Sequence, residues 1–430
     1  MTTPLRTLLS RLKRLNDSRK GKSGKTLLSN FASLTVLQIA GYVFPLITLP
    51  YLARVIGVEN FGRIAFASSI IIWFQTFVDW GFNYSATREV ARHSKEPEVL
   101  SRILSTVLQA KILLMLAAFC LLWILSITIT AFAEVRVLLI FTFLLIPGHI
   151  LFPDWFFQGV QRMKYLTILN LVAKAIFTLL VFVVVRQRKD YLYQPLLTSA
   201  GYLTAGLIAL YVITIRWHIR LRPQPWSLVM HTIRSSTDIF INQIVPNIYN
   251  SFSVILLGIM CGNVANGLFD AGRKITNIVQ QLLGNVSRTF FPFLANRIDK
   301  HRTYARLSLV LATLFALSIG LLARPSLHLL FSEEFMPAEP VVWISAITII
   351  FNIMYQVYGI NYMILEGYEK QLRQITLCGS LIGFAIAWPL IHYFSYIGTA
   401  LVILIANMIL GGGAFIYVNN HRKTNLDGIL

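Results

Sequence analysis

Residues 103–130 read ILSTVLQAKILLMLAAFCLLWILSITIT, and Lys111 is the one charged side chain among them. The hydrocarbon core of a bilayer is crossed by about 20 mostly apolar residues of α-helix. A strand in a globular core is far shorter, about 4–8 residues. The stretch therefore predicts a transmembrane helix.

Runs of the same kind recur along the chain, separated by short loops. The predicted spans are 27–53, 64–84, 103–130, 137–157, 165–185, 193–215, 238–260, 267–290, 304–322, 340–364, 371–394 and 398–418. Hydrophobic residues make up 56% of the chain and charged residues 13%, whereas soluble domains carry about 25% charged residues. We expect an all-α, polytopic membrane protein of about twelve transmembrane helices.

Basic residues are distributed unevenly between the two sets of loops. The loops on the side of the N-terminus hold 26 Lys and Arg residues and the opposite loops hold 7. Cytoplasmic loops carry such an excess, so we expect both termini in the cytoplasm and the chain in a bacterial inner membrane. The same rule accounts for the net charge of +20 without a nucleic-acid partner.

The chain also divides into two related halves. Gly57 and Gly62 recur as Gly262 and Gly267, and Arg92 and Lys95 recur as Arg297 and Lys300, all at an offset of 205. Duplicated helical bundles related by an axis along the membrane normal hold substrate between them. We expect two six-helix lobes related by a pseudo-twofold axis. The predicted parts are a basic N-terminal tail (1–26), an N-terminal lobe (27–215), a cytoplasmic linker (216–237), a C-terminal lobe (238–418) and a C-terminal tail (419–430).

The eighth predicted span carries polar side chains every three or four residues, on one face of a helix. They are Asp270, Arg273, Lys274, Asn277, Gln280, Gln281, Asn285 and Arg288. Helix packing with paired polar groups would explain part of this stripe, but one acid cannot neutralise three bases. A hydrated, cation-rich lumen that favours an anion such as a phosphate explains the rest. Candidate substrate-binding residues on this span are Arg273, Lys274, Asn277, Gln281 and Arg288.

Shorter polar stripes occur on spans 1, 2, 7 and 10. They comprise Gln38, Tyr42 and Pro45; Gln75, Asp79 and Asn83; Asp238, Asn242, Pro246 and Asn250; and Asn352, Gln356 and Tyr362. Lys111 and Lys174 lie two to three turns inside spans 3 and 5, where a lysine either faces the lumen or snorkels to the interface. Both are further substrate-binding candidates. Pro45, Pro50 and Pro246 can kink the helices that contain them.

Motifs for bond chemistry are absent from the sequence. It has no G-x-x-x-x-G-K-[ST] loop, no His/Glu metal spacing and no Ser/His/Asp set. Cys120, Cys261 and Cys378 have unrelated spacings, which predicts neither a disulfide framework nor a metal site. We expect a protein that is not an enzyme and needs neither a cofactor nor a metal.

Three stretches carry a family resemblance. They are LARVIGVENFGRIAFA (52–67), DWGFNYSATREVARH (79–93) and PDWFFQGVQRMKYLTILNLVAK (153–174). With the span count, they resemble the polysaccharide-transporter branch of the multidrug/oligosaccharidyl-lipid/polysaccharide exporter superfamily, and within it the Wzx-type O-antigen flippases. Asp79, Asn83, Arg88, Trp155 and Gln158 match the family pattern, and of these Asn83 and Arg88 become further substrate-binding candidates.

The resemblance implies a flippase that moves undecaprenyl-pyrophosphate-linked oligosaccharide repeat units to the periplasmic leaflet for lipopolysaccharide synthesis. It implies alternating access around a cationic cavity, coupled to an ion gradient. Asp79, Asp238 and Asp270 lie near the ends of their spans and are candidates to bind the coupling ion; the alternative is a structural ion pair. The O-antigen polymerase and the chain-length regulator are further expected partners, beside the lipid bilayer itself.

Three alternatives stay open from the sequence. The chain could export another lipid-linked glycan, such as an enterobacterial common antigen, capsule or exopolysaccharide unit. An ion-coupled drug exporter would need an acidic lumen, and a membrane-embedded glycosyltransferase or polymerase would need a longer outward loop than residues 323–339.

Overall fold

The computed structural model describes residues 41–427 apart from 42 and 45, without the side chains of 242, 243, 245–248, 292, 296 and 422–427. The predicted tail 1–26, Gln38, Tyr42 and Pro45 lie outside the described residues. The described chain is almost entirely helical and contains no strand. The all-α prediction is therefore confirmed.

A first helical segment, 46–79, precedes the named elements. These are α2 (Phe82–Arg92), α3 (Pro97–Thr128), α4 (Thr130–Glu134), α5 (Arg136–Phe143), α6 (Leu145–Leu151), α7 (Asp154–Gly159), α8 (Met163–Val184), η1 (Arg188–Leu192), α9 (Tyr193–Tyr211), η2 (Val212–Arg216), α10 (Trp226–Asn296), η3 (Ile298–Lys300), α11 (His301–Leu321), α12 (Ala323–Leu330), η4 (Glu333–Ala338), α13 (Glu339–Met354), η5 (Tyr355–Met363) and α14 (Glu369–Asp427). The elements η2 and η5 are π-helical.

Nine helical segments among the described residues are long and apolar enough to cross a membrane. Three of them contain residues at positive φ: Leu46–Arg92 contains Gly57, Trp80 and Gly81, Tyr249–Ala295 contains Gly262, and Glu369–His421 contains Ser395. Each of these three is long enough for two passes, so counting each as two gives the predicted twelve. Pro50 and Pro246 lie in helical backbone, and the non-helical breaks come later, at Gly57 and Gly262.

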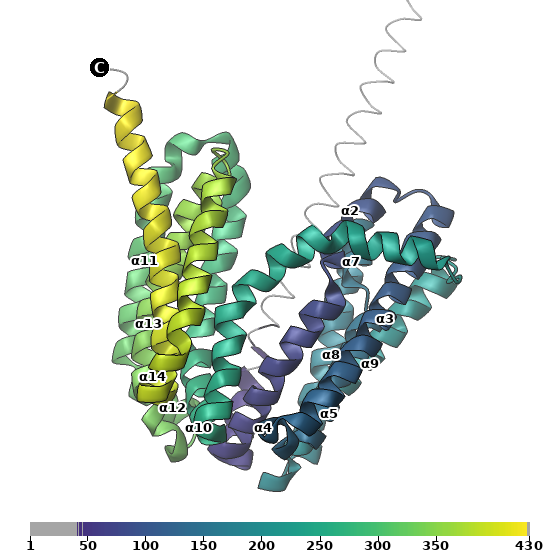
Figure 1. Cartoon of the computed structure of the whole chain (residues 1–430), viewed down its shortest axis with the longest axis horizontal. Helices are drawn as coiled ribbons and strands as arrows, with labels where there is room; N and C mark the ends of the chain where they lie inside the picture. The colour runs from purple at the N-terminus through teal and green to yellow at the C-terminus, as the bar shows by residue number, and fades with distance from the viewer. Residues whose placement is uncertain (1–40, 42, 45, 428–430) are drawn as a thin grey trace, which may run out of the picture.

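The helices form two bundles arranged as a V (Figure 1). The N-terminal lobe runs from the first segment to α9, and the C-terminal lobe from most of α10 to α14. The two lobes meet at one end, which we call the closed end, and diverge toward the other, the open end. An apolar cluster drawn from both lobes holds the closed end together, for example through Leu49, Phe61, Phe331 and Phe335.

The helix α10 connects the lobes. It begins at Trp226, well before the predicted span boundary at 238, and its first part lies across the open end of the N-terminal lobe (Figure 1). This part is amphipathic: Val229 and Ile233 pack into the N-terminal core while Trp226 and Arg234 are exposed. The Trp80 ring stacks on Phe240 at 4.1 Å and its Nε1 donates to the Ile233 carbonyl at 3.0 Å.

Two glycines bring the halves into reciprocal contact at the closed end. A Cβ on Gly62 would lie 1.7 Å from the Asn263 carbonyl oxygen, and one on Gly267 would lie 2.2 Å from the Val58 carbonyl oxygen. Val58 and Asn263 are themselves separated by 205 residues, the offset of the sequence repeat. Contacts that exchange partners in this way are what a pseudo-twofold axis between the lobes produces.

Glu334 of η4 links the two lobes beside these glycines. Its carboxylate accepts the Val58 N–H at 3.1 Å and pairs with Arg188 of η1. Because Gly57 holds φ at +75°, it turns the chain so that the Val58 N–H points at this carboxylate. The closed end is thus held by an apolar cluster and by polar contacts between the lobes.

Candidate functional site

A cavity lies between the two lobes. One part, about 850 Å³, is lined mainly by α10, α13 and η5; a second part, about 450 Å³, is lined by the first segment, α8, α9 and α10. Gly41, Asn277 and Gln281 line both parts, so the two parts adjoin each other. The cavity extends from Ile56 and Phe61 near the closed end to Arg288 and Phe291 toward the open end.

Cations from both lobes line this cavity. Lys174 comes from α8, and Lys274 and Arg288 come from α10; none of the described lining residues is acidic. Lys274 is paired with Asp270 and lies 4.2 Å from the Phe61 ring centroid. Within the described part of the chain, Lys174 and Arg288 have no ion-pair partner. The cavity is therefore net positive.

The remaining wall of the larger part is rich in amides: Asn277, Gln280, Gln281, Asn285, Asn352 and Gln356. Some of these are held in place by one another. Gln356 Nε2 donates to Asn352 Oδ1 at 2.9 Å, and Asn352 Nδ2 donates to Asn407 Oδ1 at 3.4 Å. A fixed row of amide donors and acceptors suits hydroxyl-rich ligands.

Arg273 does not line the inter-lobe cavity, although the stripe on the eighth span predicts that it does. It lines a separate pocket of about 240 Å³ inside the C-terminal lobe, where its Nη2 donates to Asn250 Oδ1 at 3.0 Å. Consecutive residues on a helix point about 100° apart, so Arg273 and Lys274 cannot share one face. Gln280 and Asn352 line both this pocket and the cavity.

Lys111 is also placed differently from the prediction. It is buried inside the N-terminal lobe and its Nζ lies 2.8 Å from Asp79 Oδ1, so it neither faces the cavity nor snorkels. Asp154 and His149 lie within electrostatic range of the same pair. His149 stacks on Tyr202, a residue that lines the cavity. Sequence reasoning missed Asp154, although it stands in the quoted stretch 153–174.

The three acids predicted for ion coupling have different surroundings. Asp79 is paired with Lys111, Asp270 is paired with Lys274, and Asp238 is exposed on α10.

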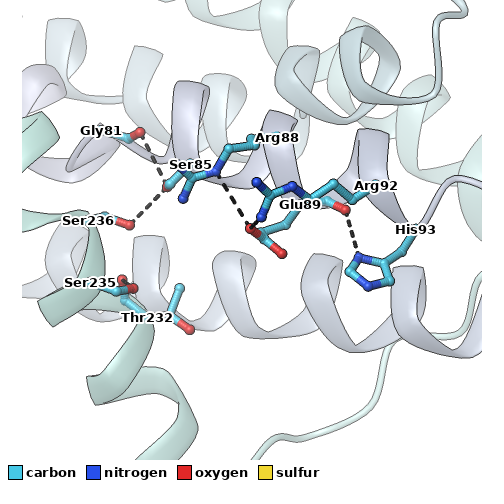
Figure 2. Close-up of polar contacts among 9 residues, drawn as sticks. All are labelled: Gly81, Ser85, Arg88, Glu89, Arg92, His93, Thr232, Ser235 and Ser236. Carbon is cyan, nitrogen blue, oxygen red and sulfur yellow. Dashed lines mark hydrogen bonds and ion pairs between the residues drawn. The ribbon is translucent and has the colours of Figure 1, made fainter.

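Arg88 and Asn83 both belong to α2. Figure 2 shows Arg88 beside the contact of α2 with α10. Ser85 Oγ lies 2.9 Å from Ser236 Oγ, and Arg88 and Arg92 both flank Glu89 on the exposed side. Asn83 is partly buried, and no partner for its Oδ1 is found among the described residues. Neither Arg88 nor Asn83 lines the cavity. Thr87 donates to the Trp155 carbonyl at 3.2 Å, so two of the quoted stretches contact each other as packed helices.

Comparison with known proteins assigns this chain to a family. The sequence model described as "Polysaccharide biosynthesis protein" matches residues 27–297, more than half of the chain. The chain belongs to the polysaccharide biosynthesis protein family. This confirms the resemblance inferred from the three stretches.

Two relatives of this family member share about a quarter of its residues. It is 26% identical over 411 residues to a protein of Escherichia coli K12, covering 92% of this chain and 98% of that protein. It is 25% identical over 396 residues to one of Shigella dysenteriae, covering 89% and 97%. Both carry the name "Putative O-antigen transporter".

Two solved structures share the fold. The lipid II flippase MurJ in an inward closed conformation superposes with a TM-score of 0.72 at 14% identity, covering 91% of this chain and 87% of that one. An inward-facing multidrug transporter of the MATE family superposes with a TM-score of 0.62 at 14% identity, covering 93% and 99%. At this identity the likeness concerns the fold alone.

Proposed function

We propose that this protein flips undecaprenyl-pyrophosphate-linked O-antigen repeat units from the cytoplasmic to the periplasmic leaflet of the bacterial inner membrane. The observation that carries the proposal is the inter-lobe cavity, with cations from both lobes and no acid among its described lining residues. The names of the two relatives support the substrate class.

Each part of the proposed substrate has a counterpart in the cavity. Lys174 and Arg288 supply positive charge for a pyrophosphate, and Arg288 adds a planar fork that binds phosphate oxygens in pairs. The amide row supplies partners for the sugar hydroxyls. A volume of about 850 Å³ lies within the range of pockets that enclose drug-sized ligands, which is the size of a few sugar units. The polyprenyl chain stays in lipid and needs only a lateral gap between the lobes.

The proposed cycle alternates access between the two sides of the membrane. In this structure the lobes are joined at the closed end, which we assign to the periplasm, and the cavity extends toward the open end, which we assign to the cytoplasm. The excess of basic residues on loops of the open end supports this orientation, with both termini cytoplasmic. Opening the other side requires breaking the contacts of Glu334 and separating the apolar cluster of the closed end.

Energy coupling is proposed at the Asp79–Lys111 pair. Unpairing or neutralising one member of a buried pair is costly, so an ion or proton that binds there changes the stability of the N-terminal lobe substantially. His149 stacks on Tyr202, and Tyr202 lines the cavity. We propose that ion occupancy at the Asp79–Lys111 pair and substrate occupancy in the cavity influence each other through these two side chains.

The test is reconstitution of the purified chain in liposomes that carry a lipid-linked oligosaccharide in one leaflet. We expect the substrate to appear in the other leaflet with its sugars and its pyrophosphate intact, and the rate to fall when ion gradients are collapsed. Hydrolysis or sugar transfer would show that the protein is an enzyme instead. A transfer rate that stays the same after the ion gradients are collapsed would rule out coupling to them.

A further inference from the structure

A second groove lies on the C-terminal lobe, away from the inter-lobe cavity. It is a groove of about 520 Å³ between α11 and the last part of α14, with η5 beneath it. Its lining residues are Arg302, Ala305, Arg306, Leu309, Val310, Thr313, Leu314, Tyr358, Phe415 and Asn419. It shares no lining residue with the inter-lobe cavity.

The groove is polar at one end and apolar along its length. On α11 the lining residues follow helical spacing, with Arg302 and Arg306 at the open end of the lobe. Val310 and Leu314 come next along the same face and expose 53% and 56% of their surface. On the opposite wall Phe415 packs edge-on against Tyr358 with ring centroids 5.0 Å apart.

The two arginines lack a neutralising partner within the described residues. No ion pair or side-chain hydrogen bond is found there for Arg302 or Arg306, and no acid lines the groove. Two adjacent guanidinium groups at the head of an apolar groove are complementary to a phosphate that carries a hydrocarbon chain.

We propose that this groove binds one anionic phospholipid of the leaflet at the open end. Its phosphate is held by Arg302 and Arg306, and an acyl chain lies along Leu309, Val310, Leu314 and Phe415. This site is separate from the flippase cavity, and the proposal stands without the proposed function.

The length of the groove favours a phospholipid over the transport substrate. From Arg302 to Leu314 the helix rises by about 18 Å. One leaflet of a bilayer core is about 15 Å deep, half of the total thickness. The groove therefore spans one leaflet, which an acyl chain fills. A substrate that must cross the membrane needs a path into the cavity, and the groove shares no wall residue with it.

Native mass spectrometry of the purified full chain in detergent tests this site. The chain is titrated with phosphatidylglycerol, or with zwitterionic phosphatidylcholine of the same acyl chains. We expect one phosphatidylglycerol to bind more tightly than phosphatidylcholine. Each basic residue near a membrane surface strengthens binding to an anionic lipid about fivefold. The double variant Arg302→Gln/Arg306→Gln should therefore weaken phosphatidylglycerol binding on the order of tenfold or more.

Two further variants separate the parts of the site. Arg102→Gln removes an exposed arginine near the start of α3 in the N-terminal lobe, away from the groove, and binding should be unchanged. Val310→Trp fills the groove and keeps both arginines, and binding should weaken.

Equal binding of the two lipids, or an unchanged affinity in the double arginine variant, would overturn the proposal. If the affinity of Val310→Trp for phosphatidylglycerol is unchanged, the acyl chain does not bind in the groove and that part of the proposal is wrong. Displacement of phosphatidylglycerol by an equal concentration of polyprenyl pyrophosphate would identify the transport substrate as the occupant, and the assignment to a phospholipid would be wrong.

Discussion

Lys174 is the residue on which the cavity mechanism can be tested most directly. It faces the cavity from the N-terminal lobe, and no described acid pairs with it. A charge-assisted hydrogen bond contributes about 1.5–3 kcal/mol. Lys174→Ala should therefore slow flipping by roughly ten- to a hundredfold at normal abundance, and Lys174→Arg should retain most of the rate.

The matched control is Lys164→Ala, which removes an exposed lysine near the start of the same helix. The rate should stay at the wild-type value, measured as transfer of lipid-linked oligosaccharide between leaflets. A Lys174→Ala variant as fast as the control would contradict the cationic-cavity mechanism.

The pair of Asp79 and Lys111 makes a different prediction, because it is buried. Lys111→Ala leaves the Asp79 carboxylate without its partner, which costs about 3–5 kcal/mol of stability. We expect a clear loss in thermal unfolding in detergent. The double variant Asp79→Asn/Lys111→Met, which removes both charges, should recover most of that stability.

Transport by the double variant then decides between a structural and a coupling role. The coupling proposal requires that the double variant be stable yet no longer respond to an ion gradient. If the double variant is stable and its transport rate depends on the gradient as in the wild type, Asp79 and Lys111 have only a structural role.

At the scale of elements, the closed end depends on the close approach of two helix turns. A Cβ on Gly62 or Gly267 would overlap the backbone carbonyl of Asn263 or Val58. Gly62→Ala and Gly267→Ala should therefore both lower the melting temperature and the transport rate, and by similar amounts because the contacts are reciprocal. Gly320→Ala, where a Cβ would meet nothing within 4 Å, should change stability by no more than about 1 kcal/mol. Wild-type behaviour of both variants would mean that the lobes are not packed as described.

The polar contact between the lobes can be tested by cross-linking in a chain without its three native cysteines. Cysteines at Arg188 and Glu334, joined by a short cleavable reagent, should stop transport until the link is cleaved, because η1 and η4 belong to different lobes. Cysteines at Asn60 and Arg188 form the control pair. Both lie in the N-terminal lobe, where Asn60 Nδ2 donates to the Arg188 carbonyl at 3.1 Å. Transport that continues with the inter-lobe link in place would exclude opening at this end.

At the scale of the whole molecule, the orientation of the V in the membrane follows from charge. A cysteine at Glu334 should react with a membrane-impermeant thiol reagent added from the periplasmic side. A cysteine at Arg220 should react only after the membrane is permeabilised. The reverse pattern would invert the topology and place the open end of the cavity in the periplasm.

Local hydropathy was enough to predict the class of this protein. The apolar runs predicted the all-α fold and the number of passes, because crossing a bilayer requires each run to satisfy its own backbone hydrogen bonds. The glycine repeat at an offset of 205 pointed to two related halves, and the structure adds the reciprocal contact of Gly62 and Gly267. The start of α10 at Trp226 escaped prediction, since an amphipathic helix lying on the lobe has no need of a continuous apolar run.

The sequence identified most of the residues that line the cavity, but it did not predict which polar residues face the cavity and which lie inside a lobe. Lys174, Lys274, Asn277, Gln281 and Arg288 line the cavity, whereas Arg273 lies in a pocket of its own and Lys111 is paired with Asp79. Hydropathy and periodicity are properties of neighbouring residues. Which face of a helix meets a cavity depends on packing between residues far apart in the chain, such as Asp79 and Lys111 or Tyr358 and Phe415, and only the tertiary structure brings these together.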